Sequence, residues 1–157
     1  MNKASFEISV ETDGAPESQA LAGFPVTDWC INALRDFVAG GGVDIRIVDE
    51  PEMSATNRQY RGREGPTNVL SFPAELHPDV ESPLLGDLLI CAPLVEREAR
   101  EQGKSTEDHL AHLVTHGALH LLGYDHENDE DAAGMEAEEA RLLARIGVSN
   151  PYQLSGG

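Results

Sequence analysis

Three histidines near residue 120 constrain the fold more than any other feature of the sequence. His116, His120 and His126 have H-x3-H-x5-H spacing, and Gly123 lies between the second and the third. If residues 115–122 are helical, His116 and His120 lie one turn apart on the same face. Gly123 can end that helix in a left-handed conformation, so that the chain returns and brings His126 close to the other two. The pattern predicts a metal site with three nitrogen ligands and an open fourth position, as in catalytic zinc sites.

The same histidine spacing occurs in zinc peptidases with the sequence H-E-x-x-H-x-x-G-x-x-H, where the glutamate serves as general base. In this chain Gly117 occupies the position of that glutamate. We therefore expect a hydrolase of zincin-like geometry that acts on something other than ordinary peptide bonds. The opposing interpretation, helix-face histidines without a metal, accounts less well for three ligands at this spacing around a glycine.

The length and composition indicate one domain. A chain of 157 residues that is 40% hydrophobic can bury a real core, so we expect residues 1–157 to form a single domain with frayed ends. No apolar run reaches the length of a membrane span and the N-terminus lacks a signal-peptide pattern, which predicts a cytoplasmic protein without a membrane partner. Cys30 and Cys91 have neither C-x-x-C nor zinc-site spacing, so we expect reduced, partly buried thiols.

The formal charge of −17 opposes a free-standing nucleic-acid binder, because phosphate contacts need Lys and Arg. Eight carboxylates and no Lys or Arg lie between Asp125 and Glu139; we interpret them as a solvated helix face rather than a dedicated interaction surface. Arg58, Arg61 and Arg63 cluster in one segment. From composition alone, surface solubility and phosphate binding explain this cluster equally well.

Hydrophobic periodicity and turn residues predict alternating strands and helices. Strands are expected at 5–10, 43–47, 68–72 and 84–91, and helices at 27–38, 51–60, 93–103, 106–122 and 129–146, with a polar turn through residues 14–16. Ser105 and Asp108 resemble a capping box for the helix that carries the metal ligands. One face of that helix is expected to carry His109, His112, His116 and His120.

Four blocks of sequence resemble the YbeY family of bacterial endoribonucleases, also called rRNA maturation factors. The blocks are Asn57-Arg-Gln-Tyr-Arg61, Pro66-Thr-Asn-Val-Leu-Ser-Phe-Pro73, Leu85-Gly-Asp-Leu-Leu-Ile90, and the run from His112 to His126. They occur in the family's order and extend the resemblance over about residues 45–146, whereas the first forty residues match only in general layout.

The resemblance implies an α+β, zincin-like domain with a small mixed sheet and a central metal-binding helix. It implies one Zn²⁺ per chain, bound by His116, His120 and His126, and a functional role for Arg61, which we expect to contact the substrate phosphate. The implied activity is that of a zinc-dependent, single-strand-preferring endoribonuclease. By the same resemblance, the enzyme matures the 3′ end of small-subunit rRNA, takes part in ribosome quality control, and meets the ribosomal small subunit or its assembly proteins.

The sequence leaves the nucleophile and the general base open, since either a water or the RNA 2′-hydroxyl could attack. His112 and Asp125 are candidates for orienting the ligands or shuttling a proton; the competing interpretations are a helix-surface imidazole and a turn or cap residue. Two other functions stay open, namely a metallopeptidase of zincin-like geometry and a non-catalytic ribosome-associated assembly factor.

The histidine spacing predicts one zinc ion per chain, with zinc-to-nitrogen distances of about 2.0–2.1 Å and a water or anion in the open position. Elemental analysis of protein prepared without an affinity tag in zinc-replete medium measures this stoichiometry. A zinc content near zero, or a fourth protein ligand such as Cys91, would contradict a catalytic site.

Overall fold

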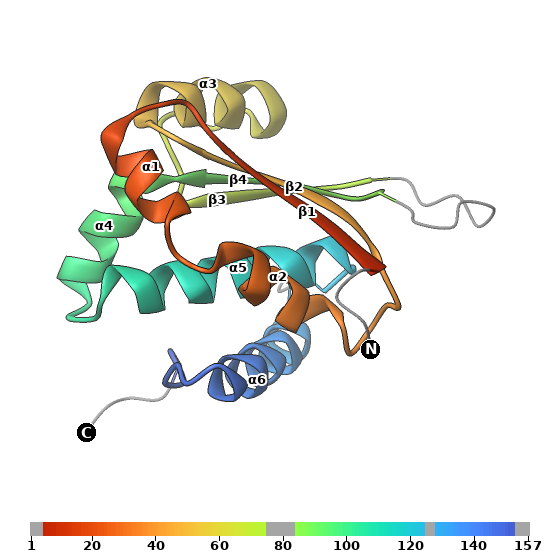
Figure 1. The fold of residues 1–157 in the computed structure, drawn as a ribbon. Helices are drawn as coiled ribbons and strands as arrows, with labels where there is room; N and C mark the ends of the chain where they lie inside the picture. Colours follow the sequence, from red (N-terminus) through yellow and green to blue (C-terminus); the bar gives the residue numbers. More distant parts are fainter. Residues whose placement is uncertain (1–4, 75–83, 125–127, 153–157) are drawn as a thin grey trace.

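A four-stranded mixed sheet forms the centre of the fold (Figure 1). The structure is a computed structural model and describes residues 5–74, 84–124 and 128–152. The strands are β1 (Phe6–Thr12), β2 (Gly41–Val48), β3 (Val69–Pro73) and β4 (Leu84–Cys91). The helices in the described part of the chain are α1 (Pro16–Ala22), α2 (Val26–Leu34), α3 (Glu50–Arg61), α4 (Ala92–Glu101), α5 (Thr106–Leu121) and α6 (Asp129–Arg145).

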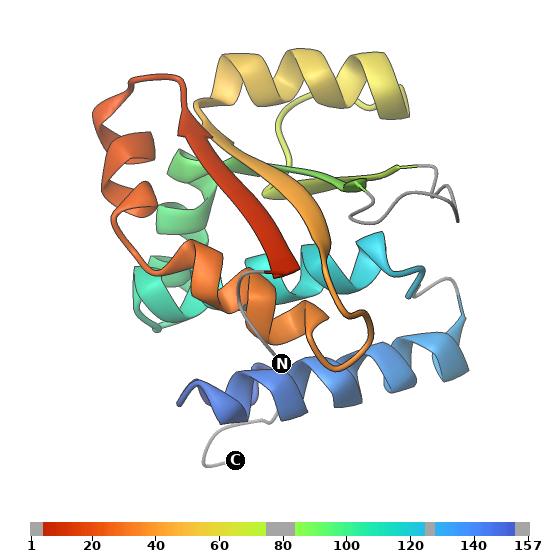
Figure 2. The ribbon, with the colours of Figure 1, turned by 45° about the vertical axis from the view of Figure 1, so that its right-hand side comes forward.

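The sheet has the strand order β1-β2-β4-β3. The strands β1, β2 and β4 run parallel to one another, and β3 pairs antiparallel with β4. The strand β3 is therefore an edge strand, with only one side of its backbone paired within the sheet. Figure 2 shows α3 on one face of the sheet and α2, α5 and α6 on the other, with α6 farthest from the strands.

Each face of the sheet buries its own apolar cluster. The larger cluster lies between the sheet and α1, α2, α4 and α5, and includes Ile45 and Leu88. The smaller one lies beneath α3 and contains Val48, Met53, Leu70, Leu89 and Cys91. In β2 the buried positions Val43, Ile45 and Ile47 alternate with Asp44 and Arg46, which confirms the period-two pattern read from the sequence.

The helix α5 packs closely against the sheet at Gly117. A Cβ atom at this position would lie 2.9 Å from Leu88 Cδ2 and 3.3 Å from Ser71 Oγ. The Ser71 hydroxyl also donates a hydrogen bond of 3.2 Å to the Gly117 carbonyl. Position 117 thus points at the sheet, where a glutamate side chain has no room, and its glycine lets the ligand-bearing helix approach β3 and β4.

Local sequence signals determine where the helices begin and end. Ser105 Oγ accepts a hydrogen bond from the Asp108 amide at 3.0 Å, which confirms the predicted cap of α5. Asn128 caps α6 in the same way through the Asp131 amide. Gly62, with φ of 66°, ends α3 in the left-handed conformation directly after Arg61.

The α+β class, the mixed sheet and the central position of the ligand-bearing helix agree with the sequence-based expectation. Two local features differ from the prediction. The predicted turn is present at Gly14 and Ala15, but residues 16–22, for which no element was predicted, form the helix α1, because Pro16 starts a helical turn that buries Ser18 and Leu21. The helix α2 ends at Leu34, so Phe37 lies beyond it and packs edge-on against Tyr124.

Across the described residues, every helix is too short or too polar to cross a lipid bilayer.

The contact at Gly117 predicts that Gly117→Glu lowers the free energy of unfolding by about 3 kcal/mol or more, because a carboxylate would be forced between Leu88 and Ser71. Gly134→Glu is the matched control. Gly134 lies on the exposed side of α6 with open space around its Cβ position, so the same change should be neutral or slightly stabilising there. Denaturant unfolding of both zinc-free variants measures the difference; equal stabilities would contradict the close approach.

Candidate active site

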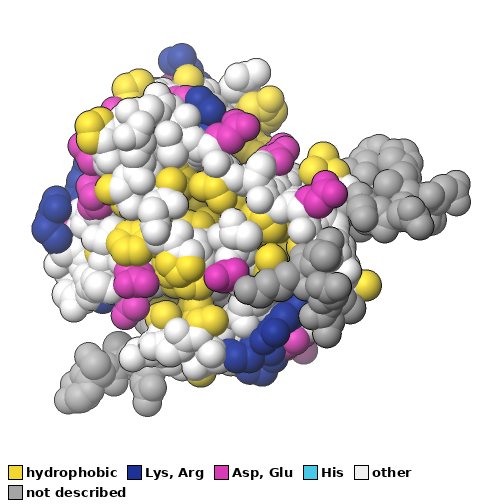
Figure 3. Space-filling view, viewed as in Figure 1, with side chains coloured by type: hydrophobic (Ala, Val, Ile, Leu, Met, Phe, Trp, Pro, Cys, Tyr) yellow, Lys and Arg dark blue, Asp and Glu magenta, His cyan; other side chains and the backbone are white. Residues whose placement is uncertain are grey.

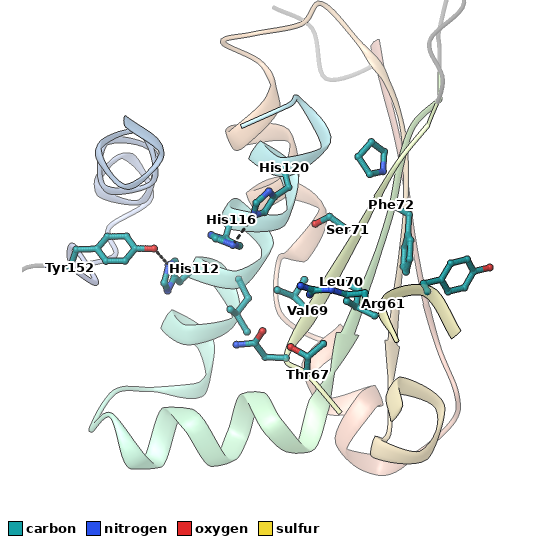
Figure 4. Close-up of a pocket in the computed structure, with 14 residues that line it drawn as sticks. Arg61, Thr67, Val69, Leu70, Ser71, Phe72, His112, His116, His120 and Tyr152 are labelled. Atoms are coloured by element: carbon teal, nitrogen blue, oxygen red, sulfur yellow. Dashed lines mark hydrogen bonds between the residues drawn. The ribbon is translucent and has the colours of Figure 1, made fainter. Parts of the chain in front are cut away.

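A cavity of about 690 Å³ lies between the edge strand β3 and the helix α5. Figure 4 shows histidines from α5 on one side of this cavity and residues of β3 on the other. The side chain of Arg61, at the end of α3, extends over β3 toward the histidines (Figure 4). The residues that line the cavity are Tyr60, Arg61, Thr67, Asn68, Val69, Leu70, Ser71, Phe72, Pro73, His112, Leu113, His116, His120 and Tyr152.

Two of the three predicted metal ligands meet at the wall of this cavity. The Nε2 atoms of His116 and His120 lie 3.0 Å apart, and their ring centroids 4.5 Å apart. The i, i+4 spacing on α5 therefore places the two imidazoles together as the sequence predicts. The third predicted ligand, His126, and its neighbour Asp125 lie outside the described residues.

A buried carboxylate on α6, Glu139, orients the imidazole of His116. His116 Nδ1 lies 3.1 Å from Glu139 Oε1, and the Glu139 side chain is fully buried. A carboxylate only accepts, so the proton of this hydrogen bond belongs to Nδ1 of His116. In the neutral imidazole this leaves a lone pair on Nε2, the atom that faces His120. A carboxylate behind a histidine is the usual arrangement around metal ligands.

Glu139 also binds two other groups of the cavity wall. His112 Nε2 lies 2.9 Å from Glu139 Oε1, and the Tyr152 hydroxyl donates to both carboxylate oxygens at 2.9 and 3.0 Å. The carboxylate therefore joins α5, α6 and the segment that follows α6. We call Glu139, His112, His116 and Tyr152 the Glu139 network.

Electrostatics keeps Glu139 ionised. Burial by itself raises the pKa of Glu139, but the hydrogen bonds and positive charge contributed by His112 and His116 outweigh burial and lower the pKa to about 2. Burial lowers the pKa of His112, against the opposing effect of Glu139, and so favours its neutral form. Burial and the charge of Glu139 raise the pKa of Tyr152, which keeps its hydroxyl protonated as a donor.

The donor set fits a metal ion best at the Nε2 atoms of His116 and His120. Two nitrogens bound to one tetrahedral zinc lie about 3.3 Å apart, close to the observed 3.0 Å. His112, His116 and Glu139 also lie close enough together to hold an ion. Their distances of 2.9 and 3.1 Å are those of hydrogen bonds to one carboxylate oxygen, and a metal there would use Nδ1 of His116 and exclude His120. We therefore assign Glu139 to the support of the ligands.

The four histidines of α5 form one stripe, as predicted from the sequence, with consecutive ring centroids 6.2, 6.3 and 4.5 Å apart. Only three of them line the cavity. His109 is buried and bonds Glu98 of α4 through Nε2 at 2.8 Å, whereas His112, His116 and His120 line the cavity. Glu98 in turn accepts from the Asn68 amide at 3.0 Å, so His109 supports the cavity through Asn68.

Arg61 lies in the last turn of α3, one residue beyond the helix end expected from the sequence. Its side chain is exposed and, among the described residues, makes no hydrogen bond or ion pair. It lines the cavity, whereas Arg58 and Arg63 are exposed elsewhere. The structure thus separates Arg61 from its two neighbours in the sequence cluster.

The two cysteines take no part in the cavity. Cys30 and Cys91 are buried, and burial raises the thiol pKa to about 12 for Cys30 and about 11 for Cys91. Both therefore remain protonated near neutral pH, which suits neither a metal ligand nor a nucleophile.

The sequence interpretation missed Glu139 and Tyr152. Glu139 belongs to the acidic run that we expected to be solvated. One signal was available, since Glu139 follows Met135 by four residues and precedes Leu142 by three, which places it on the buried face of α6. A carboxylate on a buried helix face needs a partner. Tyr152 follows α6 and has no comparable signal.

Comparisons with known proteins identify relatives of this chain. The model of the family described as Endoribonuclease YbeY matches residues 26–147. A protein of Halorhodospira halophila named Endoribonuclease YbeY is 54% identical over 142 residues, 88% of this chain and 89% of that protein. One of Pseudomonas entomophila with the same name is 57% identical over 125 residues, 79% of this chain and 80% of that protein. The solution structure of a Thermotoga maritima protein superposes with a TM-score of 0.62 at 27% identity, covering 94% of this chain and 99% of that one.

The Glu139 network predicts a defined loss of stability in acid. The folded-state pKa of Glu139, about 2, lies below its ordinary value of 4.5, so its contribution is complete above pH 4.5 and is lost as the pH falls toward 2. Because the pKa of His112 is lowered from its ordinary value of 6.5, the free energy of unfolding should begin to fall as the pH drops below 6.5. Denaturant unfolding of zinc-free protein should show both declines. Glu139→Gln should make the one below pH 4.5 smaller, and the remainder comes from other carboxyl groups with lowered pKa values, such as Asp36 and Glu98.

The same variant tests the orientation of His116. With Glu139→Gln, zinc affinity measured by chelator competition should fall by about tenfold to a hundredfold. Glu136→Gln, on the exposed side of α6, is the matched control and should leave zinc affinity unchanged. Unchanged zinc affinity in the Glu139 variant would contradict its role behind His116.

Proposed function

The chain belongs to the endoribonuclease YbeY family, and on that premise we propose that it is an endoribonuclease that cleaves single-stranded RNA with one zinc ion per chain. The observation that carries the proposal is the convergence of two imidazole Nε2 atoms, 3.0 Å apart, on a cavity that Arg61 also lines. Metal ligands and a permanent cation beside one cavity are what phosphodiester hydrolysis needs.

We propose that His116, His120 and His126 hold the zinc ion. When bound, zinc would polarise a phosphoryl oxygen and lower the pKa of a water molecule bound to it to about 7. Glu139 keeps the proton of His116 on Nδ1, so that Nε2 stays available as a ligand. The hydroxyl of Tyr152 and the imidazole of His112 hold Glu139 in position from its other sides.

Arg61 is proposed to bind the scissile phosphate. Its guanidinium offers a planar set of donors that matches phosphate oxygens and stays charged at any relevant pH. The phosphoryl group gains negative charge in the transition state, so a cation already positioned beside it lowers the barrier. Because Arg61 has no partner among the described residues, a phosphate would not have to displace an existing ion pair.

The metallopeptidase alternative is not favoured. A peptidase of this spacing needs its general base at position 117, and Gly117 points at Leu88 and Ser71 with no room for a glutamate. In the RNA reaction we propose that either a water or the RNA 2′-hydroxyl attacks the phosphorus, and each of these nucleophiles must lose a proton to a general base. His112 lines the cavity, but its Nε2 donates to Glu139 and its Nδ1 is buried, so we propose that it holds Glu139 in place and does not accept the proton.

Family membership supports a finer proposal about the substrate. We propose that the RNA is a precursor of small-subunit rRNA, cleaved near its 3′ end, and that the enzyme meets it in the cytoplasm on the ribosomal small subunit or with its assembly proteins. Ribosome quality control would follow from the same activity, since defective particles expose single-stranded rRNA.

The proposed phosphate contact predicts that Arg61→Ala lowers cleavage of single-stranded RNA by about a hundredfold or more. Zinc content and thermal unfolding should barely change, because the side chain is exposed and has no described partner. Arg58→Ala is the matched control, one turn earlier on α3 and outside the cavity, and should retain most activity. The measurement is the initial cleavage rate of a labelled RNA with and without zinc.

Contaminating ribonucleases are excluded by purifying Arg61→Glu in parallel, which should be inactive in the same assay. Full activity in Arg61→Ala would remove Arg61 from the reaction, and unfolding or loss of zinc would make it a structural residue. If the wild-type protein binds pre-ribosomal particles but cleaves no RNA, the assembly-factor alternative is correct.

A further inference from the structure

The charge of the chain limits how it can hold RNA. The chain has 28 Asp and Glu against 11 Lys and Arg, a formal charge of −17. Among the described Lys and Arg residues, Arg61 alone lines the cavity. On the face drawn in Figure 3 the basic side chains lie in small separate groups and do not form a continuous surface. Phosphate neutralisation, the usual source of affinity for nucleic acid, is therefore weak here.

An exposed aromatic side chain beside Arg61 offers another source of affinity. The side chain of Tyr60 is 64% exposed, although burying an aromatic ring is ordinarily favourable. Its ring packs edge-on against Phe72 of β3, with centroids 5.1 Å apart and an interplanar angle of 64°. Phe72 thus fixes the position of the Tyr60 ring, and both residues line the same cavity as the histidines.

We propose that Tyr60, supported by Phe72, is a base-stacking subsite for an unpaired nucleobase next to the phosphate that Arg61 binds. The inference rests on the proposed function and adds how the substrate is held. Consecutive positions on a helix point about 100° apart, so Arg61 reaches over β3 (Figure 4) while Tyr60 packs on Phe72. Stacking on a fixed aromatic ring contributes affinity for single strands without requiring positive charge.

The subsite also gives a physical reason for preferring single strands. A base inside a duplex is already stacked on both faces and paired, so it must be extruded before it can contact Tyr60. An unpaired base avoids most of that cost. Because every base has a π-face, the subsite discriminates strandedness more strongly than sequence.

The other exposed aromatic residues fit this role less well. The hydroxyl of Tyr152 is bound by Glu139, and its ring packs edge-on against His112, so it belongs to the Glu139 network. Phe37 is 36% exposed but packs against Tyr124 and does not line the cavity. Phe37 is therefore a matched control, an exposed aromatic residue in an edge-on pair away from the site.

The test uses a short single-stranded RNA, 2′-O-methylated throughout to slow cleavage, with the fluorescent base 2-aminopurine placed at each position in turn. Bound to zinc-loaded wild-type protein, at least one position should be quenched by stacking. Tyr60→Phe should keep the quenching. Tyr60→Leu, which keeps apolar bulk over Phe72, should abolish it and weaken binding by about tenfold. Phe37→Leu should behave as wild type.

Two further measurements separate stacking from structure. An RNA that lacks the base at the quenched position should bind wild-type protein about tenfold more weakly. The same RNA should bind Tyr60→Leu no more weakly than the intact RNA does. Because the wild-type measurement changes only the RNA, it tests stacking even if the variant folds poorly. The logarithm of the binding constant should fall with the logarithm of salt concentration with a slope near −0.7, the value for about one phosphate contact. In cleavage assays with unmodified RNA, Tyr60→Leu should raise KM more than it lowers kcat.

The outcomes also distinguish the two proposals. Equal quenching and affinity in Tyr60→Leu and wild type, with normal cleavage, would overturn the stacking subsite and leave the endoribonuclease function intact. A salt slope of several units would show that phosphate contacts dominate and would likewise overturn it. A wild-type protein that neither binds nor cleaves single-stranded RNA would overturn both.

Discussion

The site depends on a charged carboxylate that is buried between two helices. Removing a carboxylate from water is costly, and the cost is offset only when its oxygens are fully hydrogen-bonded. Glu139 meets this condition with donors from His112, His116 and Tyr152. Because all three donors line the cavity, the interaction that makes the buried charge tolerable also fixes the tautomer of His116, a proposed metal ligand.

The helix α5 therefore serves two purposes along its two sides. One side packs closely on the sheet at Gly117, where any side chain would have to displace Leu88, and the other presents imidazoles to the cavity and to α6. The close approach brings His116 and His120 opposite the edge strand β3 and the end of α3. A small residue in the core thus helps to set the distance between these two imidazoles and Arg61.

Much of this arrangement was predictable from the sequence, because it depends on local signals. The i, i+4 spacing determines that His116 and His120 meet, and Ser105 determines where their helix begins. The alternation in β2 identifies its buried face. The family's sequence blocks identified Arg61, whereas composition could not separate it from Arg58.

The features that the sequence did not predict arise from contacts between distant segments. Glu139 looks like any other residue of an acidic helix until α6 is packed on α5, and Tyr152 reaches the site only through that packing. Tyr60 reads as an ordinary helix residue, and its pairing with Phe72 requires the sheet to place β3 beneath α3. The helix α1 was missed because its short sequence carries too weak a periodic signal to outweigh its turn residues.

The dependence of His116 on Glu139 has a consequence for how the protein is made. Synthesis proceeds from the N-terminus, so the histidines of α5 emerge from the ribosome before their partner, which follows His116 by 23 residues, and before Tyr152, which follows His112 by 40. Until α6 has been synthesised and packed, the hydrogen bond from Nδ1 of His116 to Glu139 cannot form. A nascent chain still attached to the ribosome thus carries His116 without its carboxylate partner, so the order of translation makes the Glu139 network one of the last parts of the cavity wall to assemble.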